Sequence, residues 1–296
     1  MNLSTSKALG TTLHELIKQG EEILAAYHKP DAIIDARLLM CYLLGCKDIT
    51  LILNRDEMIS PHVEESYMYL IAKRTQGIPL QYITKSQEFM GLEFYVDERV
   101  LIPRQDTETL VETILDIAKK EPLHQVVEIG AGSGCISISL AHYRKDMNIT
   151  AIDISQEALE VTLKNARYHH VEDRISCIKS DLFDTYKGEA NTLDLIVSNP
   201  PYISREECKS LMREVEGYEP RIALTDGFDG LTFYRRISKE AKVFLKPNGI
   251  IAYEIGYNQS EDVTHILNQE GFYNIQTLKD LPGKDRVVIA RNSKQK

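Results

Sequence analysis

Short apolar runs with polar ends recur in the second half of the chain, separated by segments in which apolar residues follow helical spacing. Such runs predict buried strands, and their alternation with helices predicts a mostly parallel sheet with right-handed crossovers. The expected strands are residues 125–129, 148–153, 174–178, 193–198, 249–254, 272–278 and 285–290. The last two are close in sequence and predict an antiparallel pair joined through Leu281, Pro282 and Gly283.

The first part of the chain follows a different pattern. From about residue 11 to residue 73, apolar residues recur at helical spacing with breaks at proline and glycine, which predicts several short helices. The side chains expected on their inner faces are Leu13, Ile17, Leu24, Ile34, Leu38, Leu39, Leu43 and Leu44. This segment carries no catalytic motif, and we expect it to be either a substrate-docking module or a stabilising cap.

A strand-like pattern between Tyr82 and Ile102 predicts a hairpin with a glycine-containing turn. Its two expected strands are residues 88–91 and 94–96. The predicted organisation therefore has three parts: an N-terminal helical domain over residues 1–80, a β-hairpin linker over residues 81–103, and a catalytic domain over residues 104–296.

Composition narrows the range of functions. The formal net charge of the 296 residues is −9, which disfavours a partner held mainly through a nucleic-acid backbone. The five cysteines are irregularly spaced, so we expect neither a disulfide framework nor a metal site. The chain has no long apolar stretch and no basic-then-apolar start, and we expect a cytoplasmic protein without a membrane segment.

A glycine-rich loop follows the first strand of the expected sheet. Residues 125–129 run into Gly130, Ala131, Gly132, Ser133 and Gly134, and glycines at alternate positions let a backbone turn tightly and approach a ligand closely. The alternative is a simple turn. The next strand ends in Asp153, about 20 residues further on, which is the separation at which an acidic residue meets a ribose.

Two cofactor classes fit a loop of this kind. The dinucleotide pattern needs a glycine where this chain has Cys135, so that match fails. S-adenosylmethionine has a ribose and no phosphate, and the Asp153 carboxylate could accept hydrogen bonds from its hydroxyls. Asp181, after the third strand, could read the adenine edge, or it could instead cap a helix or form an Asx turn.

The fourth strand leads directly into Asn199, Pro200, Pro201 and Tyr202. The prolines lack N–H groups and fix φ, so the turn is stiff and rich in hydrogen-bond acceptors. Such a turn can hold a planar NH2 group at the edge where open α/β sheets bind ligands. The alternative for Asn199 is a turn-forming asparagine before proline.

The residues together resemble the HemK/PrmC family of glutamine methyltransferases, which modify peptide chain release factors. The likeness covers nearly the whole chain, and Pro103 to Glu108 is its most discriminating element, although that segment could also be a linker with N-cap chemistry at Asp106 or Thr107. Other matching stretches are Gly77 to Ile83, Leu101 to Glu108, the glycine loop, Asn199 to Tyr202, Glu219 to Arg221, and Asp229 to Leu231 with Tyr234 to Arg236.

The resemblance implies a class I S-adenosylmethionine-dependent methyltransferase with a Rossmann-like, seven-stranded, mostly parallel sheet, an N-terminal helical domain and a linking hairpin. The implied reaction is methylation of the side-chain amide nitrogen (N5) of the glutamine in the Gly-Gly-Gln loop of release factors, leaving S-adenosylhomocysteine.

Roles for individual residues follow from the same resemblance. Catalysis is expected at Asn199, Pro200 and Tyr202. The acceptor is expected to contact Asn199, Pro200, Pro201 and Tyr202. The cofactor positions carry over onto Gly130, Ala131, Gly132, Ser133, Gly134, Asp153, Asp181, Leu182 and Asn199. Leu182 departs from the family, which often has an aromatic residue there.

Two rival functions are considered. The Asn-Pro-Pro-Tyr motif also occurs in methyltransferases that act on amino groups of nucleobases, so an N6-adenine methyltransferase is the first rival. That enzyme would need a basic face, which the acidic composition disfavours. A cofactor-retaining binding factor without turnover is the second. We expect a monomer that binds no nucleic acid directly.

Overall fold

The computed structural model describes residues 10–210 and 212–293. The described residues fall into two compact units that divide between Lys85 and Ser86. No helix in this part of the chain is long and apolar enough to cross a membrane.

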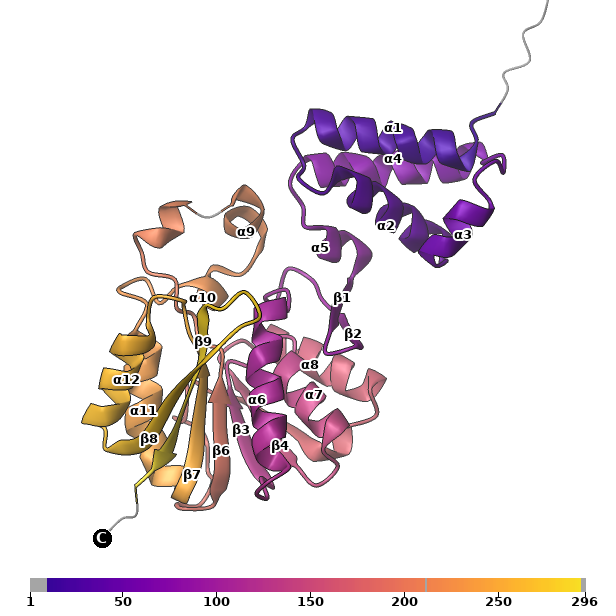
Figure 1. Ribbon diagram of the computed structural model, residues 1–296. Helices are drawn as coiled ribbons and strands as arrows, with labels where there is room; N and C mark the ends of the chain where they lie inside the picture. Colours follow the sequence, from indigo (N-terminus) through magenta and orange to yellow (C-terminus); the bar gives the residue numbers. More distant parts are fainter. Residues whose placement is uncertain (1–9, 211, 294–296) are drawn as a thin grey trace, which may run out of the picture. The chain divides into compact units, whose positions relative to one another are not determined.

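The first unit consists of five helices (Figure 1). Thr12 and Glu15 form a reciprocal capping box at its start, and Gly45, in the left-handed conformation, ends the second helix. The helices are α1 (Leu13–Ala26), α2 (Ala32–Leu44), α3 (Asp48–Leu53), α4 (Pro61–Thr75) and α5 (Leu80–Thr84).

The predicted inner faces of these helices are confirmed in part. Leu13, Ile17, Leu24 and Leu39 are buried, and Leu43 packs against the same core. Ile34, Leu38 and Leu44 were predicted inward but are exposed by 56%, 42% and 40%. Because α2 is apolar on nearly all sides, periodicity alone cannot select the face that is buried.

The second unit begins with a two-stranded antiparallel hairpin of β1 (Ser86–Phe89) and β2 (Leu92–Tyr95). Its turn contains Gly91, whose φ is +70°. The hairpin predicted from the sequence is therefore present, with both strands shifted toward the N-terminus by one or two residues.

A seven-stranded sheet forms the centre of the second unit, in the order β5-β4-β3-β6-β7-β9-β8. The first five strands are parallel, and β9 runs antiparallel to both β7 and β8. All seven predicted strands and the antiparallel pair are confirmed. The observed strands are β3 (Gln125–Ile129), β4 (Asn148–Asp153), β5 (Ile175–Lys179), β6 (Leu193–Ser198), β7 (Leu245–Glu254), β8 (Phe272–Lys279) and β9 (Asp285–Asn292).

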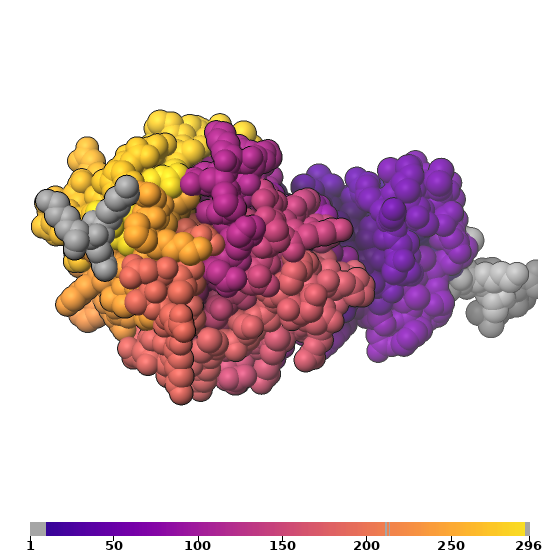
Figure 2. Space-filling view, turned by 90° about the horizontal axis from the view of Figure 1, so that it is seen from below, coloured from indigo at the N-terminus to yellow at the C-terminus, as the bar shows by residue number. Residues whose placement is uncertain are grey.

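Helices cover both faces of this sheet (Figure 1). One face carries α6 (Glu108–Ala118), α7 (Cys135–Tyr143) and α8 (Gln156–Tyr168), and the other carries α11 (Thr232–Phe244) and α12 (Ser260–Gln269). A separate apolar core lies under each set of helices. Figure 2 shows α6 beside the C-terminal strands, where Arg291 pairs with Glu121.

Short helical segments lie in the remaining connections. The 3₁₀ turns are η1 (Gln105–Thr107), η2 (Glu172–Arg174) and η3 (Glu207–Ser210), and the two short α-helices are α9 (Arg213–Tyr218) and α10 (Arg221–Leu224).

The strand order reverses between β3 and β6, which are neighbours at the middle of the sheet. At their carboxyl ends, Ser198 is paired in register with Ile129, and its hydroxyl donates a 2.7 Å hydrogen bond to the Ile129 carbonyl. In open α/β sheets, ligands bind in the crevice above such a reversal. The glycine loop and the Asn199 turn both begin at this point.

Candidate active site

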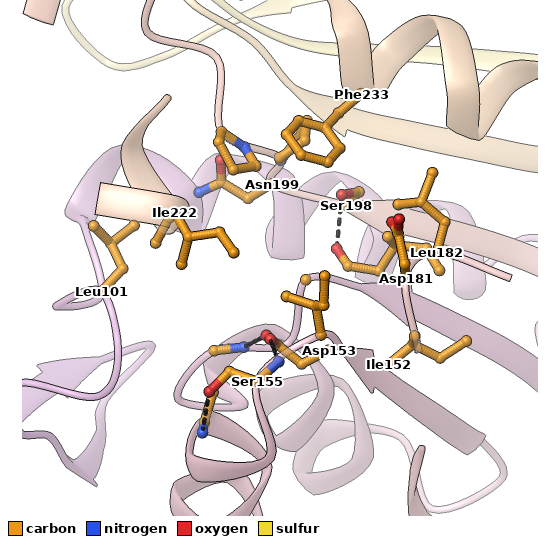
Figure 3. Close-up of a pocket in the computed structure, with 18 of the residues that line it drawn as sticks. Leu101, Ile152, Asp153, Ser155, Asp181, Leu182, Ser198, Asn199, Ile222 and Phe233 are labelled. Carbon is orange, nitrogen blue, oxygen red and sulfur yellow. Dashed lines mark hydrogen bonds between the residues drawn. The ribbon is translucent and has the colours of Figure 1, made fainter. Parts of the chain in front are cut away.

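A cavity of about 230 Å³ opens at the carboxyl ends of β3, β4 and β6, and only residues of the second unit line it. Figure 3 shows Asp153 and Ser155 on one side of the cavity and Asn199 across from them, with Leu101 and Ile222 beside Asn199. Of the predicted site residues, the cavity lining includes Gly130, Gly132, Asp153, Asp181, Leu182, Asn199, Pro200 and Pro201. Ala131, Ser133, Gly134 and Tyr202 are not among the lining residues.

The glycine loop presents bare backbone to the cavity. Gly130 and Gly132 have φ values of +78° and +56°, and a Cβ added at either position would meet no atom within 4 Å. The sequence therefore uses glycine here for backbone conformation, and the open space in front of it leaves room for a ligand to approach closely.

Gly134 serves a different purpose, because it packs against the neighbouring helix. Its φ is +79°, and an added Cβ would lie 2.8 Å from Thr162 Cγ2 and 2.9 Å from Ile138 Cδ1. The Thr162 hydroxyl also donates a 2.9 Å hydrogen bond to the Gly132 carbonyl. Close contact with α8 thus fixes the shape of the glycine loop.

We expect Gly134→Ala to lower the free energy of unfolding of the second unit by about 2 kcal/mol, since alanine is strained at positive φ and its methyl group would displace Thr162. Urea denaturation measures this loss. Gly217→Ala is the matched control, because a Cβ there meets nothing within 4 Å. Equal stability of the two variants would contradict the packing role of Gly134.

Asp153 connects the ends of β3 and β4. Its carboxylate accepts hydrogen bonds of 2.9 Å from the backbone N–H of Gly132 and of Ser155. Burial raises the pKa of Asp153, and the backbone donors oppose that rise. The two oxygens of a carboxylate offer about four lone-pair sites, so Asp153 can accept further hydrogen bonds beyond these. The side chain can thus shape the loop and still accept hydrogen bonds from a ligand's hydroxyl groups.

Asp181 and Leu182 form another side of the cavity. Asp181 makes a 3.1 Å ion pair with Arg236 of α11, and the residues after it form turns with no helix for it to cap. Leu182 is 5% exposed and packs into the core, with a φ of +51° that is unusual for leucine. Sequence reasoning did not assign a partner to Asp181, because Arg236 lies 55 positions further along (236 − 181).

The side-chain amide of Asn199 is oriented by Thr107. Asn199 Nδ2 donates a 3.2 Å hydrogen bond to Thr107 Oγ1. Among the described residues, neither Asn199 Oδ1 nor the Pro200 carbonyl accepts a hydrogen bond. Two acceptors at the lining of the cavity therefore stay available to a donor from outside.

Tyr202 points away from the cavity. Its hydroxyl donates a 3.2 Å hydrogen bond to Glu254 Oε1, and its carbonyl accepts one of 3.0 Å from Gln259 Nε2. A Cβ on Gly230 would lie 2.3 Å from the Tyr202 carbonyl oxygen, so only glycine fits there. The end of the Asn199 turn is thereby held firmly by the interior of the protein.

The segment from Pro103 to Glu108 does not line the cavity, but Thr107 contacts Asn199, which does. Thr107 precedes α6 but its side chain makes no capping hydrogen bond, and it accepts from Asn199 instead. Arg104 pairs at 2.5 Å with the buried carboxylate of Glu219. The alternative of a linker with N-cap chemistry is therefore wrong for Thr107. The sequence identified this segment as the most discriminating element of the family resemblance, but it could not show that Thr107 contacts Asn199.

Comparison with known proteins places the chain in a family. Residues 15–84 match the family described as PrmC N-terminal domain, and residues 105–215 match the methyltransferase small domain. The chain is 43% identical to the release factor glutamine methyltransferase of Clostridium acetobutylicum over 256 residues, which is 86% of this chain and 90% of that protein. The chain belongs to the release factor glutamine methyltransferase family.

Another member of this release factor glutamine methyltransferase family, from Clostridium botulinum, is 40% identical over 279 residues, covering 94% of this chain and 99% of that protein. The crystal structure of a methyltransferase from Pyrococcus furiosus matches with a TM-score of 0.50 at 18% identity, over 72% of this chain and 94% of that one. The match to the Pyrococcus furiosus structure shows only that the two proteins share a fold, which is the class I methyltransferase sheet.

The cavity fits the cofactor of this methyltransferase family. S-adenosylmethionine offers two ribose hydroxyls, a flat adenine and a sulfonium methyl group. The open space before Gly130 and Gly132, the free lone pairs of Asp153 and the apolar wall of Leu182 and Ile152 match the first two groups. No cluster that could hold a metal ion is found among residues 10–210 and 212–293.

Proposed function

We propose that this protein methylates the side-chain amide nitrogen (N5) of the glutamine in the Gly-Gly-Gln loop of peptide chain release factors, with S-adenosylmethionine as methyl donor. Membership of the release factor glutamine methyltransferase family supports the substrate class. The observation that carries the chemistry is the Asn199 turn, where two acceptors without partners line the cavity across from Asp153.

The acceptor amide poses a chemical difficulty that the site must overcome. An amide nitrogen is a weak nucleophile because its lone pair is delocalised into the carbonyl group. When bound, S-adenosylmethionine supplies an electrophilic methyl group. Asn199 Oδ1 and the Pro200 carbonyl would accept the two N–H bonds of the glutamine amide and aim its nitrogen at that methyl group.

Position and charge together lower the barrier. The two acceptors stabilise the positive charge that develops on the nitrogen, and they are fixed before the reaction starts. Good orientation is worth up to roughly 7–11 kcal/mol. Tyr202 contributes by holding the turn through its bond to Glu254. After methyl transfer, the departing proton leaves to solvent or to a carbonyl group.

The cofactor roles are part of the same proposal. Asp153 would accept from the ribose hydroxyls, and the loop from Gly130 to Gly134 would let the cofactor lie close to the backbone. Leu182 would pack on the adenine, with Asp181 at its edge. The pairing of Asp181 with Arg236 supports a position at the rim of the cavity.

A labelling experiment tests the proposed reaction directly. The protein is incubated with radiolabelled S-adenosylmethionine and, separately, release factor, DNA and RNA. We expect label in the release factor alone, on a glutamine identified by mass spectrometry. Label found only in DNA or RNA would instead establish the nucleobase methyltransferase, and label in none of them would favour a binding factor without turnover.

We propose further that the N-terminal helices form a docking module for the release factor. Large apolar side chains lie exposed on α2 and α3, and Ile34, Leu38 and Tyr42 recur at four-residue spacing along one side of α2. Exposed apolar groups that cluster in this way are typical of protein interfaces. The further members are Ile33, Ile49, Ile52 and Leu53.

We expect Ile34→Glu to raise the KM for intact release factor about tenfold, because burying a charge in an apolar interface weakens binding. Methylation of a short Gly-Gly-Gln peptide should be unchanged. Lys18→Glu, at an exposed position on α1, is the control for the added negative charge. An unaltered KM in the Ile34 variant would count against docking at this face.

The remaining features of the proposal follow from the substrate. Release factors act during translation, so we place the enzyme in the cytoplasm. The net charge of −9 supports recognition of the release factor itself without direct contacts to nucleic acid. We propose that the active enzyme is a monomer, since residues of a single chain supply the whole cavity lining.

A further inference from the structure

The segment from Pro103 to Glu108 contacts Asn199 through a turn that is too short to be stable by itself. Thr107 ends the three-residue 3₁₀ turn η1, and its N–H donates to the Arg104 carbonyl at 3.1 Å. A single turn of this kind fixes several dihedral angles for few hydrogen bonds. Contacts with other elements must therefore fix the place of the Thr107 hydroxyl, which accepts the hydrogen bond from Asn199 Nδ2.

Both ends of the segment are bound to other parts of the second unit. Arg104, before the turn, donates at 2.5 Å to Glu219, in the connection between α9 and α10. Glu108, after the turn, accepts at 2.6 Å from the Met90 N–H of the hairpin. Between these two contacts, Asp106 forms an ion pair with a residue of β9. The turn itself therefore depends on Asp106 for its place.

Arg286, near the start of β9, presents a rigid guanidinium group to Asp106. Its Nη1 donates to the Ile255 carbonyl at 3.3 Å, and its Nε and Nη2 donate to Asp280 Oδ2 at 3.3 and 3.2 Å. Nη2 also lies 2.9 Å from Asp106 Oδ2. Because Ile255 and Asp280 fix the plane of this guanidinium, its contact with Asp106 has a fixed position as well.

The contact with Asp106 is not needed to neutralise Arg286. The side chains of Arg286 and Asp280 are 9% and 2% exposed, so a buried carboxylate already supplies the opposite charge. The Asp106 side chain is 47% exposed, and an ion pair with such exposure contributes little to folding stability. The pair nevertheless joins β9 to the residue that precedes Thr107. This placement indicates a role in positioning.

We propose that Asp106 and Arg286 are positioning residues, whose ion pair holds η1 so that Thr107 keeps the Asn199 side-chain amide in place beside the cavity. This inference rests on the function proposed for Asn199. Without the pair, η1 is free to shift, and the Asn199 amide loses a fixed partner. Misplacement of a reacting group by about 1 Å can lower a rate about 100-fold, so a partial shift is measurable.

Asp106→Ala removes the ion pair at a half-exposed position, so the variant should fold normally. We expect it to lower kcat for release factor methylation about tenfold. The dissociation constant of S-adenosylmethionine should stay nearly unchanged, because neither Asp106 nor Thr107 lines the cavity. Asp116→Ala is the matched control, since it breaks an exposed 2.7 Å ion pair with Lys119 on α6 and should keep full activity.

A double-mutant cycle tests whether Asp106 acts through Thr107. We expect Thr107→Val to lower kcat about tenfold as well. The double variant of Asp106→Ala and Thr107→Val should be no slower than Thr107→Val alone, because both changes interrupt the same contact with Asn199. Independent effects would instead multiply to about 100-fold. Thr107→Ser keeps the hydroxyl and should retain kcat.

The Asn199 amide also reports its own position without the reaction. In protein labelled with 15N-asparagine, the Asn199 side-chain signal is assigned by its absence in Asn199→Asp. We expect this signal to shift in Asp106→Ala and in Thr107→Val, and to be unchanged in Asp116→Ala. General loss of folding would change the signals of all the asparagines together, which separates it from a local change at Asn199.

The inference is overturned if Asp106→Ala keeps full kcat, if the losses multiply in the double variant, or if the Asn199 signal is the same in Asp106→Ala as in the wild type. A loss of cofactor affinity as large as the loss of kcat would also overturn it. Failure of the proposed function has a different signature. In that case the Asn199 signal shifts in Asp106→Ala, but the wild-type protein transfers no methyl group to release factor.

Discussion

Asn199→Ala is expected to lower kcat for release factor methylation by at least ~100-fold while S-adenosylmethionine binds with nearly unchanged affinity. The variant removes one of the two acceptors that would hold the glutamine amide, and loss of one preorganised polar contact costs this much in other enzymes. The hydrogen bond to Thr107 is lost as well, but neither of its partners belongs to the glycine loop. Single-turnover kinetics and calorimetric titration of the cofactor separate the two effects.

Asn268→Ala, at an exposed position near the end of α12, is the matched control for this variant. It should keep full activity. Near-normal turnover of Asn199→Ala would refute the proposed hydrogen bond from the glutamine amide to Asn199 Oδ1. A large loss of cofactor affinity in that variant would assign Asn199 to the cofactor site instead of the acceptor site.

Asp153→Asn is expected to weaken S-adenosylmethionine binding by about 10-fold to 100-fold, because a hydrogen bond to a charged group contributes about 1.5–3 kcal/mol. The amide replaces one acceptor oxygen with a donor, which opposes the N–H group of Gly132 or Ser155. The effect on kcat at saturating cofactor should be small. Equilibrium titration of the cofactor measures the loss.

The pH dependence of cofactor binding provides a second measurement of the same side chain. Burial raises the pKa of Asp153, and the charged form is the one that accepts from the ribose hydroxyls. Affinity should therefore weaken as the pH falls toward that raised pKa, and this dependence should vanish in Asp153→Asn. Asp262→Asn, on exposed α12, is the control. An unchanged dissociation constant would move the ribose site elsewhere.

The sheet could be predicted from the sequence because its strands are unusually clear. Most of the parallel strands contain an apolar run that ends at a polar residue, and both faces of the sheet are covered by helices. The largest difference is in β7, which begins at Leu245, four residues before the predicted start at residue 249. Pro247 and Asn248 are residues typical of turns, so the sequence predicts a later start. The pairing of β7 with β6 shifts register at this point.

The partners of the site residues could not be predicted in the same way. The Asn199 side chain is oriented by Thr107, which lies 92 residues away along the chain, and only the folded sheet brings them together. The sequence predicts that Tyr202 contacts the acceptor, whereas in the structure its hydroxyl donates a hydrogen bond to the buried Glu254. Sequence patterns place residues on strands and loops, whereas side-chain direction depends on neighbours that are remote in sequence.

In the N-terminal helices, the sequence pattern predicted burial for side chains that the structure leaves exposed. On α2, Ile34 and Leu38 were predicted inward because they are apolar, and the folded unit leaves them exposed. An apolar residue in a pattern indicates burial against some partner, and that partner need not be part of the same chain.

One buried side chain connects the hairpin to the glycine loop. Asn165 of α8 accepts from the Tyr95 N–H, and its Nδ2 donates to the carbonyls of Tyr95 and Ser133, each at 2.9 Å. Because this amide is fully buried, water cannot replace either partner when one of them moves away. The hairpin and the glycine loop therefore cannot separate without a large cost in free energy. If the glycine loop binds the methyl donor as proposed, insertions into the hairpin will weaken the affinity for that donor.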